Sequence, residues 1–241
     1  GILAGAGGAG KTAAFFSLAV SIATKRDFLG QCSVVKRGKV ALILGEQDND
    51  DFSRRLWEVL DRIQARPDER AFVKQNIYRL PCAGSSARVA DPASDAGERL
   101  LKRLEADGPW AAILFDPLSR FGGPEMETDN RAATETIEFF ERMTKLPGKP
   151  TVLLSHHFRK GDRSNPRSDS IRGASALKDG ARWAAVLMHD DDDGDVNERT
   201  VTLRVVKANR VATGVELKFK LIKGVVAPAV SSERKGRPYE V

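Results

Sequence analysis

The sequence predicts an α/β fold: a mostly parallel central sheet with helices on both faces and an antiparallel extension near the C-terminus. Three short apolar runs, residues 39–44, 110–115 and 150–155, have the length of strands and carry few polar residues. Such continuous runs are typical of parallel strands buried on both faces. Segments with apolar residues at helical spacing alternate with these runs, and this alternation is the pattern of a parallel sheet.

The elements of the first part follow in a regular order. A strand end at residues 1–4 leads through a glycine-rich loop into a helix. The predicted helices, each with apolar residues at helical spacing, span residues 12–25, 50–64, 96–106 and 128–146. A further short strand is predicted at residues 77–80.

The pattern changes after the third apolar run. Residues 158–179 are rich in Arg, Lys, Ser, Asp and Gly, and we expect a long exposed loop there. Strand-like segments joined by turns follow at residues 182–188, 200–207 and 215–222. They predict hairpins that extend one edge of the sheet.

We expect one domain over residues 1–230 and a basic, flexible tail over residues 231–241, because 241 residues suit a single α/β domain. The first residue is Gly1 rather than Met, so an N-terminal part is expected to be missing. Hydrophobic residues make up 41% of the chain and charged residues 30%, which argues against wholesale disorder. No apolar run approaches the roughly 18 residues of a membrane-spanning helix.

The charge and the cysteines narrow the class of protein. A formal net charge of +6 permits a polyanionic partner such as nucleic acid without requiring one. Cys32 and Cys82 lie far apart and outside any CxxC motif, so neither a disulfide framework nor a zinc site is predicted. We expect two reduced thiols in a cytoplasmic protein.

A glycine-rich motif gives the strongest functional signal. Residues 5–12 match G-x-x-x-x-G-K-[ST] in full and read Gly5, Ala6, Gly7, Gly8, Ala9, Gly10, Lys11 and Thr12. Backbone N–H groups can converge on a phosphate where no side chain intervenes, and the start of the following helix adds its positive end. Lys11 would contact the β- and γ-phosphates of ATP, and Thr12 would offer a hydroxyl to Mg²⁺. A glycine-rich turn without a ligand is the weaker alternative.

Acidic residues follow two of the buried strands. Asp116 ends the run 110–115, at the edge of the sheet where ligands bind, and could hold Mg²⁺ together with Thr12. Pro117 follows directly, so the residue that orients the attacking water must come from elsewhere. Glu46 is the first candidate, because we expect its strand to neighbour the strand before the glycine motif. Asp48 is the alternative.

Further polar and basic residues could complete the site. His156 and His157 follow the run 150–155, and we favour His157 as a sensor of the γ-phosphate. Arg182 and Lys207 lie on the late strands, where an arginine could act in the site of a neighbouring subunit. The alternative for both is an ordinary surface cation.

Two basic segments suit contact with a phosphate backbone. One is the loop 119–130 with Arg120, and the other is the loop 158–179. The candidate DNA-binding residues are Arg120, Arg159, Lys160, Arg163, Arg167 and Arg172. A solvated loop is the alternative, since the loop 158–179 has no aromatic residue beyond Phe158 that could stack on a base.

Six segments together resemble a known family. They read AGAGGAGKT, LILGEQD, ILFDPLSRF, LLSHHFRKG, GASALKDGARW and VVKANR, and they run from the glycine motif to about Arg210. The chain resembles the RecA-type P-loop ATPases, in particular the plasmid replicative helicases of the RepA-like group. It departs from the family pattern at Val211, where a polar turn is expected, and in the string GEQD.

The resemblance implies a RecA-like fold, ATP with Mg²⁺, and a hexameric ring with ATP between subunits and single-stranded DNA in the channel. It places Lys11 and Thr12 on the P-loop, Asp116 on the Walker B aspartate and Glu46 on the catalytic glutamate. It implies a sensor at His157. It also implies an arginine finger at Arg182, with Lys207 as a second cation from the neighbour.

Three functions stay open. The first is an ATP-driven helicase or translocase on single-stranded DNA in plasmid or mobile-element replication. The second is a recombination or repair ATPase of RecA type. The third is a nucleotide-switched scaffold that does not act on DNA, because this fold serves several tasks.

Overall fold

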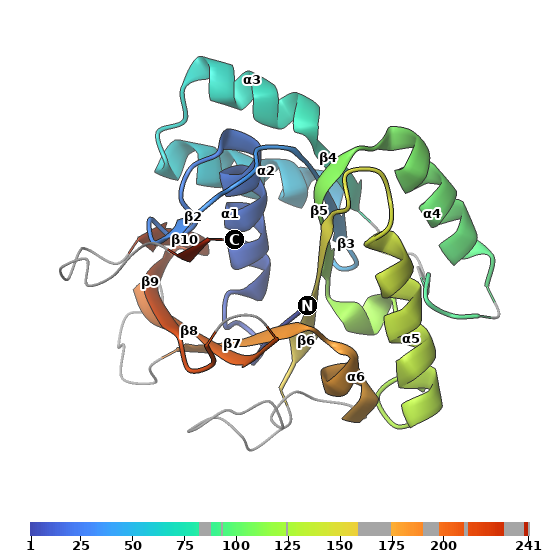
Figure 1. The fold of residues 1–241 in the computed structure, drawn as a ribbon. Helices are drawn as coiled ribbons and strands as arrows, with labels where there is room; N and C mark the ends of the chain where they lie inside the picture. Colours follow the sequence, from blue (N-terminus) through green and yellow to red (C-terminus); the bar gives the residue numbers. More distant parts are fainter. Residues whose placement is uncertain are drawn as a thin grey trace.

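In the computed structural model, a nine-stranded sheet crosses the centre of the molecule (Figure 1). The residues described are 1–81, 88–92, 94–123, 125–158, 175–189, 198–209, 212–228 and 239–240. The strands of this sheet are β1 (Ile2–Gly5), β3 (Lys39–Leu44), β4 (Ile77–Pro81), β5 (Trp110–Asp116), β6 (Thr151–His157), β7 (Trp183–His189), β8 (Glu198–Ala208), β9 (Glu216–Ile222) and β10 (Val225–Pro228). Their order is β10-β9-β8-β7-β1-β6-β5-β3-β4.

The sheet has a parallel part and an antiparallel part, as the sequence predicts. The strands from β7 to β4 run parallel to their neighbours, and β8, β9 and β10 extend the edge beyond β7 as antiparallel hairpins. The mixed α/β prediction is therefore confirmed.

Helices cover both faces of the sheet. They are α1 (Lys11–Thr24), α2 (Asn49–Arg62), α3 (Pro67–Asn76), α4 (Ala96–Asp107), α5 (Asn130–Met143) and α6 (Ser175–Gly180). Figure 1 shows α1, α2 and α3 on one side of the parallel strands, and α4 and α5 on the other. No helix among the described residues is long and apolar enough to cross a membrane.

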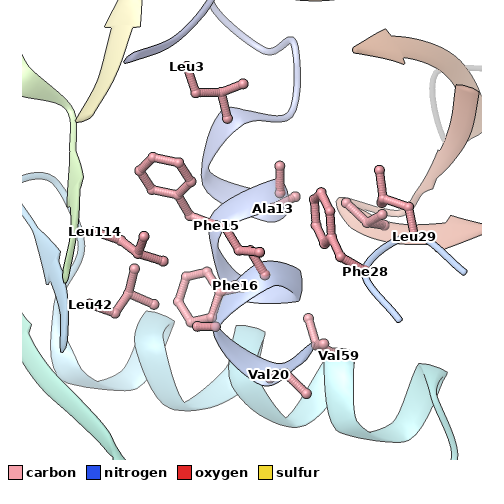
Figure 2. Packing of buried hydrophobic residues seen from close by; sticks show 14 of the residues in the cluster. Leu3, Ala13, Phe15, Phe16, Val20, Phe28, Leu29, Leu42, Val59 and Leu114 are labelled. Atoms are coloured by element: carbon pink, nitrogen blue, oxygen red, sulfur yellow. The ribbon is translucent and has the colours of Figure 1, made fainter. Parts of the chain in front are cut away.

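Helix α1 lies in the middle of the larger hydrophobic core. Eleven of its fourteen residues are buried, because it packs on the parallel strands, on α2 and α3, and on β10, and it shares its core with residues of β8 and β9. In Figure 2, Phe15 and Phe16 point toward Leu42 and Leu114 of the parallel strands, and Phe28 lies on the other side of the helix. A helix buried on all sides has a fixed position, and this fixes the loop that precedes it.

The alternation of side chains decides which strand residues face α1. Along β6, Val152 and Leu154 belong to the core beneath α4 and α5, and Leu153 packs against the core around α1. Successive strand residues point to opposite faces, so Ser155 and His157 share the face of Leu153. On β5, Leu114 lies in the core around α1, which puts Asp116 on this face too.

Several elements differ from the sequence prediction. Helix α3 was missed because Glu69 and Val73 are its only buried residues, so its apolar pattern is weak. Its start still carries a recognisable signal, with Pro67 in the first turn and Glu69 accepting a hydrogen bond from the backbone N–H of Arg66.

The expected loop 158–179 is wrong at both ends. Phe158 is buried against β1 and β7, and Ser175–Gly180 forms α6, whose Leu177 is fully buried beside α5. The basic, flexible tail expected over residues 231–241 stays a prediction. Tyr239–Glu240 forms β11, which pairs with β2 (Cys32–Ser33), while residues 231–238 and 241 lie outside the described part.

Candidate nucleotide-binding site

The glycine motif connects β1 to α1 at the carboxyl edge of the parallel strands. Gly8 and Gly10 have positive φ angles of 76° and 90°, which glycine adopts without strain. A Cβ atom at Gly7 or Gly8 would meet nothing within 4 Å, so both face open space. No acidic residue occupies the first turn of α1. The loop therefore presents a bare helix start to solvent, which is the geometry that binds phosphate.

Lys11 is held inside this loop. Lys11 is only 7% exposed, and its Nζ donates to the carbonyl oxygens of Gly5 (2.9 Å) and Ala6 (2.8 Å). Burial lowers the pKa of Lys11, and the charges of Asp116 and Glu46 oppose this shift. A desolvated ammonium with neutral carbonyl partners gains most from an anion, so the residues present fit a phosphate group.

Asp116 joins three elements at the same edge. Its carboxylate accepts hydrogen bonds from the Thr12 hydroxyl on α1, at 2.5 Å, and from the buried Ser155 hydroxyl on β6. A hydroxyl beside a carboxylate is a donor set that Mg²⁺ accepts when phosphate oxygens and waters complete its shell. The described residues hold no group of three or more His, Cys, Asp or Glu suited to a metal.

Ser155 is the site residue that sequence reasoning missed. It lies one position before the two histidines, and its role follows only from the pairing of strands. β6 lies between β1 and β5, so a residue at its carboxyl end can touch a side chain at the end of β5. The available signal was a small polar residue at the end of an apolar run, on the same face as His157.

The two histidines face opposite sides of the sheet. His157 pairs with Gly5, the first residue of the glycine motif, and shares the face of Ser155. His156 pairs with Ala4 and is fully buried on the other face. The geometry therefore favours His157 over His156 for any contact with a bound phosphate.

The strand that carries Glu46 to the site has a different position in the sheet than predicted. Its strand β3 does not neighbour β1, because β6 and β5 lie between them, so that expectation is wrong. β3 instead pairs with β5, and the Gly45 N–H donates to the Asp116 carbonyl oxygen at 2.8 Å. Glu46 is still close enough for its charge to act on Lys11.

Asp48, the alternative to Glu46, has a structural partner set. It caps α2, and its carboxylate accepts from the backbone N–H groups of Asp50 (3.0 Å) and Asp51 (2.8 Å). An N-cap aspartate stabilises the helix start through these bonds. This favours Glu46 over Asp48 as the candidate for orienting the attacking water.

Arg182 and Lys207 lie near the amino end of β7, away from the carboxyl ends of the parallel strands where the glycine motif lies. Arg182 precedes β7, and Leu187 of β7 pairs with Gly5. Five residues of strand separate Arg182 from Leu187 by roughly 16 Å. Lys207 pairs with Ala184 of β7 and donates to the carbonyl oxygens of Lys178 and Asp179 at the end of α6, both at 2.8 Å. Neither cation reaches the P-loop of its own chain.

Only one of the candidate DNA-binding residues can be placed. Arg120 is exposed at the end of a short 3₁₀ turn, Leu118–Arg120, that follows β5. The other five lie outside the described residues: Arg159, Lys160, Arg163, Arg167 and Arg172.

The fold and this site together define a P-loop ATPase with a RecA-type fold. A family model described as AAA domain matches residues 1–163, and the chain belongs to this family. No curated protein matches the chain.

Solved structures show the same fold at low sequence identity. One describes a DnaB-like replicative helicase and its interactions with primase. It is similar at a TM-score of 0.67 and 14% identity over 94% of this chain, which spans 56% of the helicase chain. The RadB recombinase is similar at a TM-score of 0.62 and 10% identity, over 95% of this chain and 90% of that chain.

Proposed function

We propose that this chain is the motor domain of an ATP-driven helicase or translocase on single-stranded DNA, of the plasmid RepA-like kind. The observation that carries the proposal is the placement of the site residues. Lys11, Thr12 and Asp116 gather at one edge of the sheet, and Arg182 lies at the opposite edge. If Arg182 acts in catalysis, it acts on the ATP of a neighbouring copy, which is the arrangement of a ring.

In this reaction each residue has a separate task. Lys11 would bind the β- and γ-phosphates, and Thr12 and Asp116 would hold Mg²⁺, which neutralises the charge that develops on the phosphates. Glu46 would orient the attacking water, and His157 would contact the γ-phosphate beside Gly5. Arg182 of the next subunit would stabilise the transition state, with Lys207 beside it.

The likeness to the DnaB-like helicase over nearly the whole chain supports this proposal over a scaffold without DNA. The likeness to the RadB recombinase supports the second candidate, a recombination or repair ATPase, because this chain covers most of that protein. The hexameric state and the action in plasmid or mobile-element replication belong to the first candidate alone.

The deciding experiment is steady-state ATP turnover with and without single-stranded DNA, with Lys11→Ala as the blank. Several-fold stimulation by DNA supports a motor or a recombinase. Closed rings in negative-stain images and displacement of a paired strand then support the helicase, and DNA-length filaments support the recombinase. Turnover that DNA leaves unchanged contradicts both and supports the scaffold.

A further inference from the structure

An ion pair connects the water-orienting glutamate to the turn that follows β5. The Nε atom of Arg120 lies 3.4 Å from Oε1 of Glu46, and the two side chains are 57% and 56% exposed. Glu46 follows β3, and Arg120 follows β5, which is the neighbour of β3 in the sheet. The pair therefore bridges two strand ends beside the P-loop.

The backbone of Arg120 is fixed, although its guanidinium is not. Leu118 and Phe121 on either side are fully buried, and the Phe121 ring meets Phe115 edge to face at 5.2 Å. The Arg120 N–H also donates to the carbonyl oxygen of Pro117 at 3.1 Å. Movement at this position is consequently confined to the long side chain.

The stem of the Arg120 side chain lies across Gly45, the residue directly before Glu46. A Cβ atom at Gly45 would come within 2.6 Å of Cβ and 2.7 Å of Cγ of Arg120. This approach requires a glycine, because any side chain would push the arginine away. The close approach directs the guanidinium to the Glu46 carboxylate.

We propose that Arg120 is a positioning residue that restrains Glu46 at rest, and that a nucleic-acid phosphate releases Glu46 by taking the guanidinium. The DNA part rests on the proposed function. A guanidinium on a carboxylate oxygen competes with the attacking water for the same lone pairs. An exposed ion pair of this length is weak, whereas guanidinium and phosphate form short, often paired hydrogen bonds, so the exchange is favourable.

The first test is ATP turnover without DNA. Arg120→Gln removes the charge and keeps much of the side chain, and basal turnover should rise by about threefold to fivefold, the scale set by an exposed ion pair. Arg103→Gln is the matched control, because the Arg103 side chain is similarly exposed, at 64% against 57% for Arg120, and pairs with Asp107 on α4. Basal turnover that stays at the wild-type rate or falls in Arg120→Gln overturns the proposal.

Two further variants show whether the effect passes through Glu46. Gly45→Ala displaces the arginine stem without changing any charge, and it should raise basal turnover in the same direction. The double variant Glu46→Gln with Arg120→Gln should stay at the low rate of Glu46→Gln alone. A double variant that regains turnover means that Arg120 acts on something else, and this contradicts the proposal.

The second test uses single-stranded DNA. Stimulation of turnover by DNA should fall toward onefold in Arg120→Gln. The slope of log DNA affinity against log salt concentration should become less steep by about 0.7, the contribution of one phosphate contact. An unchanged slope overturns the release by phosphate. If wild-type turnover depends on Lys11 but ignores DNA, the proposed DNA function fails, and the basal rise alone then decides whether Arg120 restrains Glu46.

Discussion

The two ends of the candidate site are built differently. At the phosphate end, Lys11, Asp116 and Ser155 are buried and joined by short hydrogen bonds to the P-loop or to one another. At the water end, Glu46 and Arg120 are more than half exposed and share one long contact. The difference teaches that, in the proposed reaction, binding falls to groups fixed by the core and hydrolysis falls to groups that can move. A site of this kind could bind ATP without hydrolysing it at once.

The largest effect should come from the phosphate end. Lys11→Ala removes the one side-chain charge inside the P-loop, so turnover should fall on the order of 10³-fold and ATP affinity should fall with it. Turnover is measured by phosphate release, and affinity by a fluorescent ATP analogue. Full turnover in this variant would contradict the site assignment.

Glu46→Gln should separate the two ends. The amide cannot accept a proton from water, so turnover should drop by about 10²-fold or more, while ATP binding should stay near the wild-type level. Asp48→Asn is the matched control, since asparagine still caps α2. If Asp48→Asn loses turnover and Glu46→Gln keeps it, the roles of the two carboxyl groups are reversed.

Ser155→Ala should give a moderate effect at the phosphate end. Without the buried hydroxyl, Asp116 loses a hydrogen bond that orients it, so the Mg²⁺ concentration for half-maximal turnover should rise about tenfold, as for other residues that orient metal ligands. The maximal rate at saturating Mg²⁺ should change little. Ser17→Ala, a buried serine on α1, serves as the control and should leave the Mg²⁺ requirement unchanged.

The smallest effect concerns stability and pH. Burial lowers the pKa of Lys11, so between that pKa and its ordinary value near 10.5 the unfolded chain binds more protons than the folded one. Stability of the wild type should therefore rise with pH in this window relative to Lys11→Met, by at most about 1.4 kcal/mol per pH unit. Denaturant unfolding at several alkaline pH values measures the slope, and a flat or falling difference would show that the lysine is not desolvated.

The parts that the sequence predicted depend on local patterns. The P-loop, the apolar strands 39–44 and 110–115 and the position of Asp116 all follow from residues close together in the chain. Ser155 and the route of Glu46 depend on the order of strands, because a contact with Asp116 requires knowing that β6 lies beside β5. The cap that Lys207 places on α6 likewise joins segments that no local pattern connects.

Helix α3 and helix α6 were missed for a related reason. Each buries few residues, so the hydrophobic period that identifies a helix is faint. The start of α3 could have been found from its proline and glutamate, which satisfy the first backbone groups of a helix.

The setting of α1 bears on how the chain is synthesised. β1 pairs with β6 and β7, and α1 packs against β10 and shares its hydrophobic core with Phe219 of β9, all made after residue 150. The apolar surface of α1 is therefore covered only after strands that follow it by well over a hundred residues have been made. Contacts so distant in sequence slow folding. A growing chain would expose this helix until those strands emerge, which makes it a natural client for chaperones that bind apolar segments.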